Sequence, residues 1–404
     1  MAIIHPFQGW RPTPEKAPEI SSVPYDVISA SEAAVMAEGK EESFLHVIRP
    51  EIDLPEGTPF HADEVYEKGA KNLKKLLQSP NLKQDKKPSL YVYQLETSDR
   101  KQTGLFACVS VEDYDNDVIL KHELTRPDKE DDRTRHILTQ KAHAEPVMLT
   151  FKDEKGSVTQ QMEKTMRFSA PEIEFQAEGG VWHRIWKVSS PVDLVEEFVS
   201  IPKLYVADGH HRCKSASRAS EELHKSDSTP LGEAEYDYFP AVLFPIDQMK
   251  ILPYNRIIKK VRGDQFARLK KKFDLQAGAD PSPKSKGTIS IYFDGSWYGV
   301  SLPKPKGTDA VSKLDVQLIQ QEILSPIFGI ENPRTDPNID FVGGIRGTTE
   351  LEKRVDSGDA DLAISTYATA IEELVQVSDE GQLMPPKSTW FEPKIRSGLI
   401  IHTF

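Results

Sequence analysis

Residues 201–216 of the chain read Ile201-Pro-Lys-Leu-Tyr-Val-Ala-Asp-Gly-His-His-Arg-Cys-Lys-Ser-Ala216, and this stretch predicts the centre of the fold. Residues 204–207 are apolar and partly β-branched, which indicates a buried strand. Gly209 supplies the conformational freedom for a sharp exit from that strand. Apolar residues then recur three to four positions apart, at Cys213, Ala216, Ala219 and Leu223. This spacing predicts a helix with one buried stripe, which begins directly after the turn.

The polar turn between that strand and helix has the residue types of a phosphate-binding loop. The beginning of a helix presents unpaired N–H groups and the positive end of the helix dipole. His210, His211 and Arg212 add side-chain donors at this point. Two alternatives stay open: Asp208 is also typical of a plain helix cap, and histidine is a common metal ligand. Adjacent histidines on a helix diverge, however, and no HExxH pattern completes a metal site.

The length and composition indicate a globular protein of two domains, or of three small ones. The chain has 404 residues, of which 38% are hydrophobic and 28% charged. No apolar run approaches the length of a membrane span, and the first residues lack the features of a signal peptide. Two cysteines, Cys108 and Cys213, make no disulfide framework. We expect a cytoplasmic protein that does not bind membranes.

The net charge of -12 argues against a protein that binds nucleic acid through bulk electrostatics. A small phosphorylated ligand remains compatible with this charge. Basic residues concentrate locally in residues 126–135 and 387–396, where a small anion can use them.

A second unusual stretch, residues 121–136, is mostly charged and directly follows the apolar residues 118–120. A charge run is usually a solvated face, and that alternative stays open. His122 and Glu123, however, lie at the exit of a predicted strand, where enzymes built on sheets place reactive groups. Glu123 is therefore a candidate general base.

Residues 384–390 read Met-Pro-Pro-Lys-Ser-Thr-Trp and predict a rigid loop that presents Lys387, Ser388 and Thr389. An ammonium group and two hydroxyls are typical of phosphate sites, although a Pro-Lys-Ser loop is also an ordinary surface turn. Residues 254–258, Tyr-Asn-Arg-Ile-Ile, form a mixed polar and apolar element to which the sequence assigns no role. Gly343-Gly344 fits a ligand contact or a tight turn equally well.

Further elements follow from periodicity and turn residues. A helix is expected within residues 61–78, strands at residues 89–95 and 104–111, and a hairpin over residues 288–302 around Asp294-Gly295. The fold class is mixed α+β. We expect an N-terminal portion over residues 1–104, a catalytic core over residues 105–260, and a C-terminal segment over residues 261–404 that completes the substrate site.

These patches together resemble those of known proteins. The chain from about His5 to His402 is similar to a large bacterial family known only as a domain of unknown function. Three patches resemble, in the same order, the free serine kinases of archaea, which belong to the ParB and sulfiredoxin-like fold group. The patches are His122-Glu123, residues 206–212 and residues 356–389. The chain departs from the kinases in its first hundred residues, in a longer interval between Glu123 and Asp208, and in Trp390, where the kinases have arginine.

The resemblance implies a ParB/sulfiredoxin-like nucleotide-binding core and phosphoryl transfer between a nucleotide and free serine. It implies that Glu123, Asp208 and His210 are catalytic, with Asp208 also holding Mg²⁺. Gly209, His210, His211 and Arg212 would bind the phosphates of ADP or ATP. His122, Lys387, Ser388 and Thr389 would bind the substrate, serine or O-phosphoserine.

Two other functions stay open at this stage. One is a phosphoserine or phosphomonoester hydrolase that uses the histidine and arginine cluster without a nucleotide. The other is a nucleotide-binding switch of the ParB type, although the chain lacks the basic composition of a DNA-binding face. The partners expected are a nucleotide and a small substrate, with no nucleic acid, and the sequence leaves the oligomeric state open.

Overall fold

The computed structural model describes all 404 residues and divides into two compact units. The first unit contains residues 1–121, 125–249 and 393–404, and the second contains residues 122–124 and 250–392. Strand β5 (Lys101–Ser110) runs through residue 104, so both sides of the boundary expected there lie in the first unit. The secondary structure is mixed α/β throughout, as the sequence predicts.

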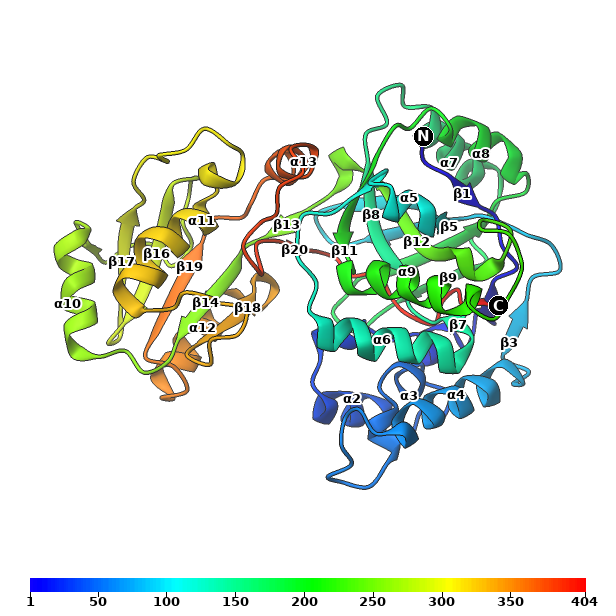
Figure 1. The fold of residues 1–404 in the computed structure, drawn as a ribbon, viewed down its shortest axis with the longest axis horizontal. Coiled ribbons are helices and arrows are strands. Elements are labelled where there is room, and N and C mark those ends of the chain that lie inside the picture. Colours follow the sequence, from blue (N-terminus) through cyan, green and yellow to red (C-terminus); the bar gives the residue numbers. More distant parts are fainter. The chain divides into compact units, whose positions relative to one another are not determined.

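The first unit is built on a nine-stranded mixed sheet (Figure 1). The strand order is β6-β11-β8-β12-β5-β4-β10-β9, and β1 pairs with β5. Most pairs are antiparallel, but β11 runs parallel to β6, and β12 runs parallel to β8. The strands are β1 (Ile4–His5), β4 (Tyr91–Glu96), β5, β6 (Ile119–Leu120), β8 (Val147–Phe151), β9 (Ile173–Gln176), β10 (Trp182–Lys187), β11 (Leu204–Asp208) and β12 (Tyr238–Pro245).

Two short antiparallel pairs complete the strands of this unit, β2 with β3 and β7 with β21. Their bounds are β2 (Trp10–Pro12), β3 (Leu82–Gln84), β7 (Ala142–His143) and β21 (His402–Thr403). Because β21 belongs to residues 393–404, the chain returns to the first unit after the second unit is complete.

The helices of the first unit lie beside this sheet or pack against other helices of the unit (Figure 1). They are α1 (Ala17–Ile20), α2 (Ala30–Ala37), α3 (Leu45–Ile48), α4 (Asp63–Leu77), α5 (Val111–Asp115), α6 (Pro127–Gln140), α7 (Ser157–Phe168), α8 (Pro191–Phe198) and α9 (His210–His224). Helix α9 packs against α5 and α6, and α6 packs against α4. The buried stripe of α9 includes Cys213, Ala216 and Ala219, as the spacing predicts. None of the helices in the chain has the length and hydrophobicity that a membrane-spanning segment needs.

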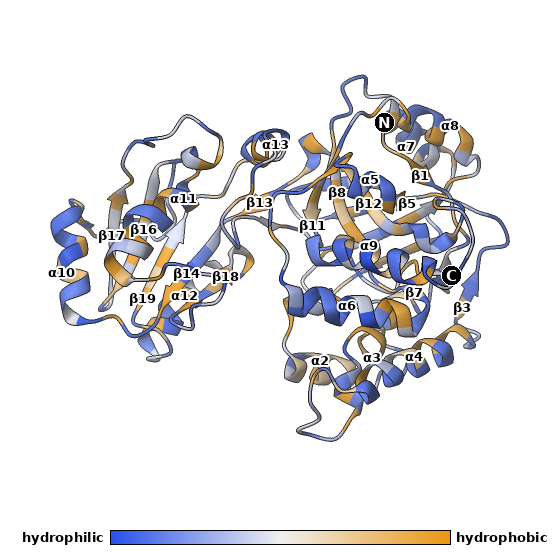
Figure 2. Ribbon diagram, viewed as in Figure 1, coloured by the Kyte–Doolittle hydropathy of each residue, from blue (hydrophilic) through white to orange (hydrophobic).

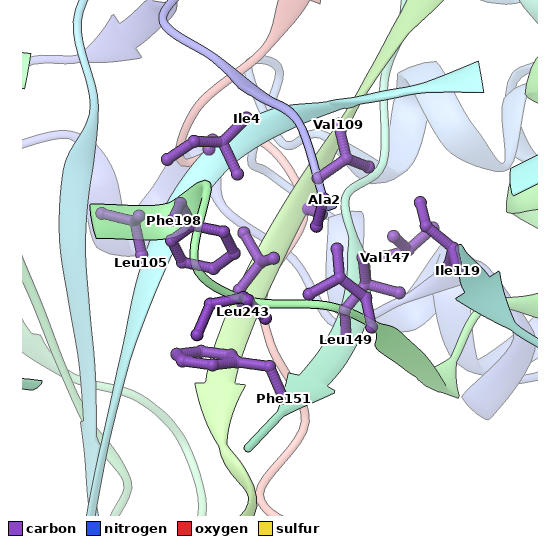
Figure 3. Close-up of a cluster of buried hydrophobic side chains, with 14 of the residues drawn as sticks. Ala2, Ile4, Leu105, Val109, Ile119, Val147, Leu149, Phe151, Phe198 and Leu243 are labelled. Carbon is purple, nitrogen blue, oxygen red and sulfur yellow. The ribbon is translucent and has the colours of Figure 1, made fainter. Parts of the chain in front are cut away.

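Alternating apolar residues of the central strands form the core of the first unit (Figure 3). Leu105, Ala107 and Val109 project from β5, and residues of β8 and β12 meet them. The ring of Phe151 lies 5.0 Å from that of Phe198. Figure 2 shows the hydrophobic colouring concentrated along such strands, while the ribbons of α6 and α9 are largely in the hydrophilic colour. The core therefore fixes the end of β11, where the polar turn begins.

The second unit has a six-stranded sheet of order β15-β17-β16-β19-β14-β18 and a short pair, β13 with β20. Its strands are β13 (Ile251–Leu252), β14 (Tyr254–Ile258), β15 (Gln276–Ala277), β16 (Thr288–Phe293), β17 (Ser296–Ser301), β18 (Ile339–Gly343), β19 (Leu362–Thr366) and β20 (Trp390–Phe391). Its helices are α10 (Gly263–Lys272), α11 (Asp315–Ile319), continued by a π-helical segment over Gln320–Phe328, α12 (Gly347–Asp356) and α13 (Ile371–Asp379).

The hairpin of β16 and β17 confirms the prediction made for residues 288–302. Its turn residues Asp294 and Gly295 have φ angles of +49° and +69°, which a two-residue turn of this type requires. The Gly343-Gly344 pair lies where β18 ends and a 3-10 turn over Gly344–Arg346 begins, which agrees with the alternative of a tight turn. A Cβ atom at Gly343 would lie 2.5 Å from the ring of Trp390, so the glycine there makes room for a tryptophan.

Candidate functional site

The polar turn after β11 has the geometry of an open helix N-terminus. Strand β11 ends at Asp208, Gly209 has a φ of +103°, and α9 begins at His210. Gly209 is the N-cap residue, and no side chain caps the helix. The alternative that Asp208 caps α9 is therefore wrong. The first N–H groups of a 15-residue helix stay available to an anion.

The carboxylate of Asp208 is held by cations instead of by the helix. It accepts a hydrogen bond of 2.9 Å from Nζ of Lys394, and Nη2 of Arg212 lies 3.9 Å from its other oxygen. The Asp208 and Lys394 side chains are 22% and 16% exposed. Burial by itself would raise the pKa of Asp208, but the positive charges of Lys394 and Arg212 lower it well below its ordinary value. Asp208 is thus a carboxylate at all physiological pH values.

Arg212 lies beneath the turn and is 7% exposed. Its Nη1 donates to the carbonyl oxygen of Pro146, and its Nη2 lies 3.7 Å from Asp26. The Nε and Nη2 atoms have no hydrogen-bond partner. The guanidinium therefore places a positive charge under the beginning of α9, and its Nε and Nη2 atoms can still donate hydrogen bonds.

A cavity of about 40 Å³ beside Arg212 is lined by further buried polar residues. Glu145 accepts a hydrogen bond from the N–H of Tyr25 and lies 3.6 Å from Nη1 of Arg133. Burial raises the pKa of Glu145, although Arg212 and Arg133 oppose the shift. The run of charged residues 121–136 is therefore only partly a solvated face, because α6 buries Asp132 and Arg133.

The two histidines of the turn, His210 and His211, are partly exposed at the first turn of α9. The N–H of Arg126 lies 3.4 Å from Nδ1 of His211. The four predicted phosphate-binding residues, which are these two histidines, Gly209 and Arg212, therefore all lie in one turn of the first unit.

We predict that Gly209→Ala weakens ADP binding by about tenfold or more and destabilises the protein. A non-glycine residue in a left-handed conformation costs about 1–2 kcal/mol. The new Cβ would also lie 3.1 Å from Val147 and from Nε of Arg212, so the turn has to shift. The matched control is Gly156→Ala, because Gly156 is the N-cap of α7 with a φ of +67°, and its added Cβ would meet only Nε2 of Gln160, at 3.9 Å. Thermal unfolding should show a lower melting temperature than that of the wild type for both variants. Calorimetric ADP binding should change only for Gly209→Ala, and unchanged affinity there would contradict the prediction.

We predict that protonation of Asp208 lowers the free energy of unfolding in acid. Its pKa is lower in the folded protein than the value of about 3.9 typical of an unfolded chain. Its contribution to stability is therefore fully present above about pH 4 and is lost as the pH falls toward the folded-state pKa. Urea unfolding of the wild type and of Asp208→Asn should differ most at neutral pH and converge toward pH 2. A difference that does not depend on pH would contradict this assignment.

The other predicted residues belong to the second unit. His122 is buried, and its Nε2 lies 3.3 Å from Oγ1 of Thr389. Its carbonyl oxygen accepts a hydrogen bond of 2.7 Å from the N–H of Met384. Glu123 is partly exposed beside it. The structure thus brings together residues that are more than 260 positions apart in the sequence.

The loop after Pro386 contains one exposed and one buried candidate residue, Lys387 and Ser388. Lys387 is exposed, has a φ of +57°, and places Nζ 5.3 Å from the centre of the Tyr254 ring. Ser388 is buried and donates a hydrogen bond of 2.6 Å to the carbonyl oxygen of Pro385. The hydroxyl of Ser388 is therefore engaged within the loop, whereas Lys387 is exposed and Thr389 is partly exposed.

The sequence reasoning missed two residues that contact predicted site residues: Lys394, which contacts Asp208, and Arg256, which contacts the carbonyl oxygen of Lys387. Lys394 lies in the basic stretch 387–396, but nothing in the sequence indicates that its partner is Asp208. Arg256 lies in β14 and is 2% exposed. The available signal was a charged residue inside a strand-like element of mixed polar and apolar residues, because a buried charge needs a reason.

Asp208 has the properties of one Mg²⁺ ligand, but it does not form a complete metal site. The chain contains no group of three or more His, Cys, Asp or Glu side chains placed to hold a metal ion. Mg²⁺ commonly binds one or two carboxylates and completes its shell with water and the phosphates of a substrate. The single carboxylate fits Mg²⁺ that arrives with a nucleotide. A larger groove of about 980 Å³, lined by residues of α2 and α4, contains none of the predicted site residues.

Comparison with solved structures finds similar chains at low identity. A conserved hypothetical protein from Pyrococcus furiosus is 12% identical, with a TM-score of 0.37 over 73% of this chain and 95% of that one. A free serine kinase in complex with AMP is 12% identical, with a TM-score of 0.36 over 73% and 92%. SbnI from Staphylococcus aureus, with a C-terminal truncation, is 12% identical, with a TM-score of 0.39 over 72% and 85%.

No curated protein matches the chain in sequence. The profile of one family, described as "Protein of unknown function (DUF1015)", matches residues 4–317, which is more than half of the chain. The chain therefore belongs to the DUF1015 family.

Proposed function

We propose that the protein transfers a phosphoryl group between a nucleotide and the hydroxyl of free L-serine. The observation that carries the proposal is the uncapped N-terminus of α9, which follows the left-handed Gly209 and has the buried cation Arg212 beneath it. Such a terminus favours phosphate through its N–H groups and its dipole. We further propose that the sheet and α9 form a ParB/sulfiredoxin-like nucleotide-binding core within the expected residues 105–260.

The proposal assigns each predicted residue a task. The turn from Gly209 to Arg212 binds the terminal phosphates of the nucleotide. Glu123 accepts the proton of the serine hydroxyl as its oxygen attacks the terminal phosphorus. The bond from that phosphorus to the bridging oxygen breaks, so ATP leaves as ADP, or ADP leaves as AMP. Phosphoryl transfer depends mainly on alignment and on neutralisation of charge, which these groups supply.

The substrate groups are assigned to the second unit. His122, Lys387, Ser388 and Thr389 bind the substrate, with the loop after Pro386 holding the phosphate of O-phosphoserine. Asp208 would hold Mg²⁺, which neutralises phosphate charge when it is bound with the nucleotide. His210 is proposed as a catalytic residue beside the transferred phosphoryl group. The reverse reaction, from O-phosphoserine and a nucleotide to serine, uses the same groups.

The test is to incubate the full chain with Mg²⁺, O-phosphoserine and either ADP or AMP. Serine, the phosphorylated nucleotide and free phosphate are followed together, and a control omits the nucleotide. Equal amounts of serine and of ATP, or of serine and ADP, are expected. Phosphate released without nucleotide would replace the proposal with a phosphomonoester hydrolase. Tight nucleotide binding with no turnover in either direction would leave a nucleotide-binding switch.

A further inference from the structure

Two buried side chains fix the orientation of successive peptide groups in the loop after Pro386. Nη2 of Arg256, which is 2% exposed, donates to the carbonyl oxygen of Lys387 at 3.3 Å. Oγ1 of Thr369, which is 8% exposed, donates to the carbonyl oxygen of Ser388 at 2.9 Å. Both carbonyl groups therefore point toward donors in the interior of the second unit.

The amide groups of the same two peptides face the other way, because C=O and N–H point in opposite directions across a planar trans peptide. These amides are the N–H groups of Ser388 and Thr389, and neither donates a hydrogen bond within the structure. The preceding residue, Lys387, has a left-handed φ of +57°. Successive amides beside a left-handed residue form concave sites for anions.

Arg256 also supplies a positive charge that no carboxylate neutralises. Its hydrogen bonds go to the carbonyl oxygens of Tyr254 and Lys387, and its Cζ lies 5.6 Å from the centre of the Phe341 ring. Burial lowers its pKa to about 10, so the guanidinium remains charged at neutral pH. A buried charge without a counter-ion is costly, and an anion on the loop would reduce that cost.

We propose that Arg256 and Thr369 are positioning residues of a phosphate-binding nest formed by the amides of Ser388 and Thr389. Arg256 orients the first amide and provides the charge, and Thr369 orients the second. The ligand class is a phosphomonoester dianion. The choice of O-phosphoserine within that class rests on the proposed function, whereas the nest itself rests on the loop.

The experiment follows the amide resonances of Ser388 and Thr389 in the full chain, labelled with ¹⁵N-serine and ¹⁵N-threonine. Inorganic phosphate, O-phosphoserine and serine are titrated separately. Both amides are expected to shift downfield with the two phosphate ligands and to stay in place with serine. Tighter binding of O-phosphoserine than of inorganic phosphate would identify the monoester as the ligand.

The variants test the two positioning roles. Arg256→Met is expected to weaken O-phosphoserine binding at least tenfold, and Arg256→Lys by roughly threefold, since a hydrogen bond to a charged group is worth about 1.5–3 kcal/mol and 1.4 kcal/mol is tenfold. Thr369→Val should also weaken binding, and Thr369→Ser should restore it. The matched control is Arg268→Met, because Arg268 also donates to a carbonyl, that of Pro326, but has Asp264 at 3.9 Å.

Each outcome decides the proposal. Amides that do not shift, or Arg256→Met and Thr369→Val proteins that bind phosphate as the wild type does, would overturn it. If Arg256→Met does not fold, the comparison of Thr369→Val with Thr369→Ser carries the test. Phosphate binding that depends on Arg256 and Thr369 in a protein without nucleotide-dependent turnover would support the nest and refute the proposed phosphoryl transfer. The two failures are therefore distinguishable.

Discussion

Replacement of Glu123 by glutamine is expected to lower kcat for phosphoryl transfer by about 10²–10⁴-fold, the usual worth of a general base. Glutamine keeps the shape of the side chain but cannot accept the proton of the serine hydroxyl. Binding of the nucleotide should change little, because Glu123 is not among the residues proposed to bind its phosphates, which are Gly209 to Arg212. Initial rates in both directions and the Kd for ADP are the measurements.

Measuring both the forward and the reverse reaction makes this test more specific. A general base of the forward reaction is the general acid of the reverse reaction, so both rates should fall by the same factor and the equilibrium constant should not change. The matched control is Glu196→Gln, an exposed glutamate on α8. Near-normal turnover by Glu123→Gln would remove the assignment of the base, even if the protein proves to be a phosphotransferase.

Arg212→Met is expected to lower the free energy of unfolding by about 3–5 kcal/mol, because removing one partner leaves buried charge uncompensated. Arg212 is 7% exposed and lies within 4 Å of both Asp26 and Asp208. Its charge also opposes the rise in the pKa of Glu145 that burial causes. Without the guanidinium, Glu145 should bind a proton at a higher pH than in the wild type. Urea unfolding at pH 7 measures the loss.

The control for this variant lies on the same helix. Arg218 is 34% exposed and pairs with Glu130 and Asp131, so Arg218→Met should cost only about 0.2–1 kcal/mol. The double variant Arg212→Met with Glu145→Gln should recover part of the loss, since it removes a buried charge that Arg212 compensates. No recovery would mean that the loss comes from packing, and a loss as small as that of Arg218→Met would contradict the buried charge cluster.

Local pattern predicted the individual elements well. The helix α4, the strand and helix around Gly209, and the hairpin at Asp294-Gly295 follow from periodicity and turn residues, which act over a few neighbouring positions. The sheet order was not predictable in this way. Strand β12 pairs with β5 and β8, and no local feature of the sequence encodes these partners.

In the candidate site, too, contiguous motifs were predictable and contacts between distant residues were not. The residues of the turn at Asp208 and of the loop at Lys387 were recognisable because each motif is contiguous in the sequence. Their supports were not, because Lys394 and Arg256 act on residues far from them in the sequence. The environment of Arg212 was also hidden, since burial depends on α6 and on the first residues of the chain, which meet it only in the folded protein.

The return of residues 393–404 to the first unit has a consequence for folding during translation. Strand β7 must wait for β21, and Asp208 for Lys394, until residues 250–392 have been translated. At about 5–20 residues per second, translation of this segment takes roughly 7–29 s. The second unit can therefore emerge and fold while the first unit still lacks its last residues, and Asp208 acquires Lys394 as its partner only near the end of synthesis.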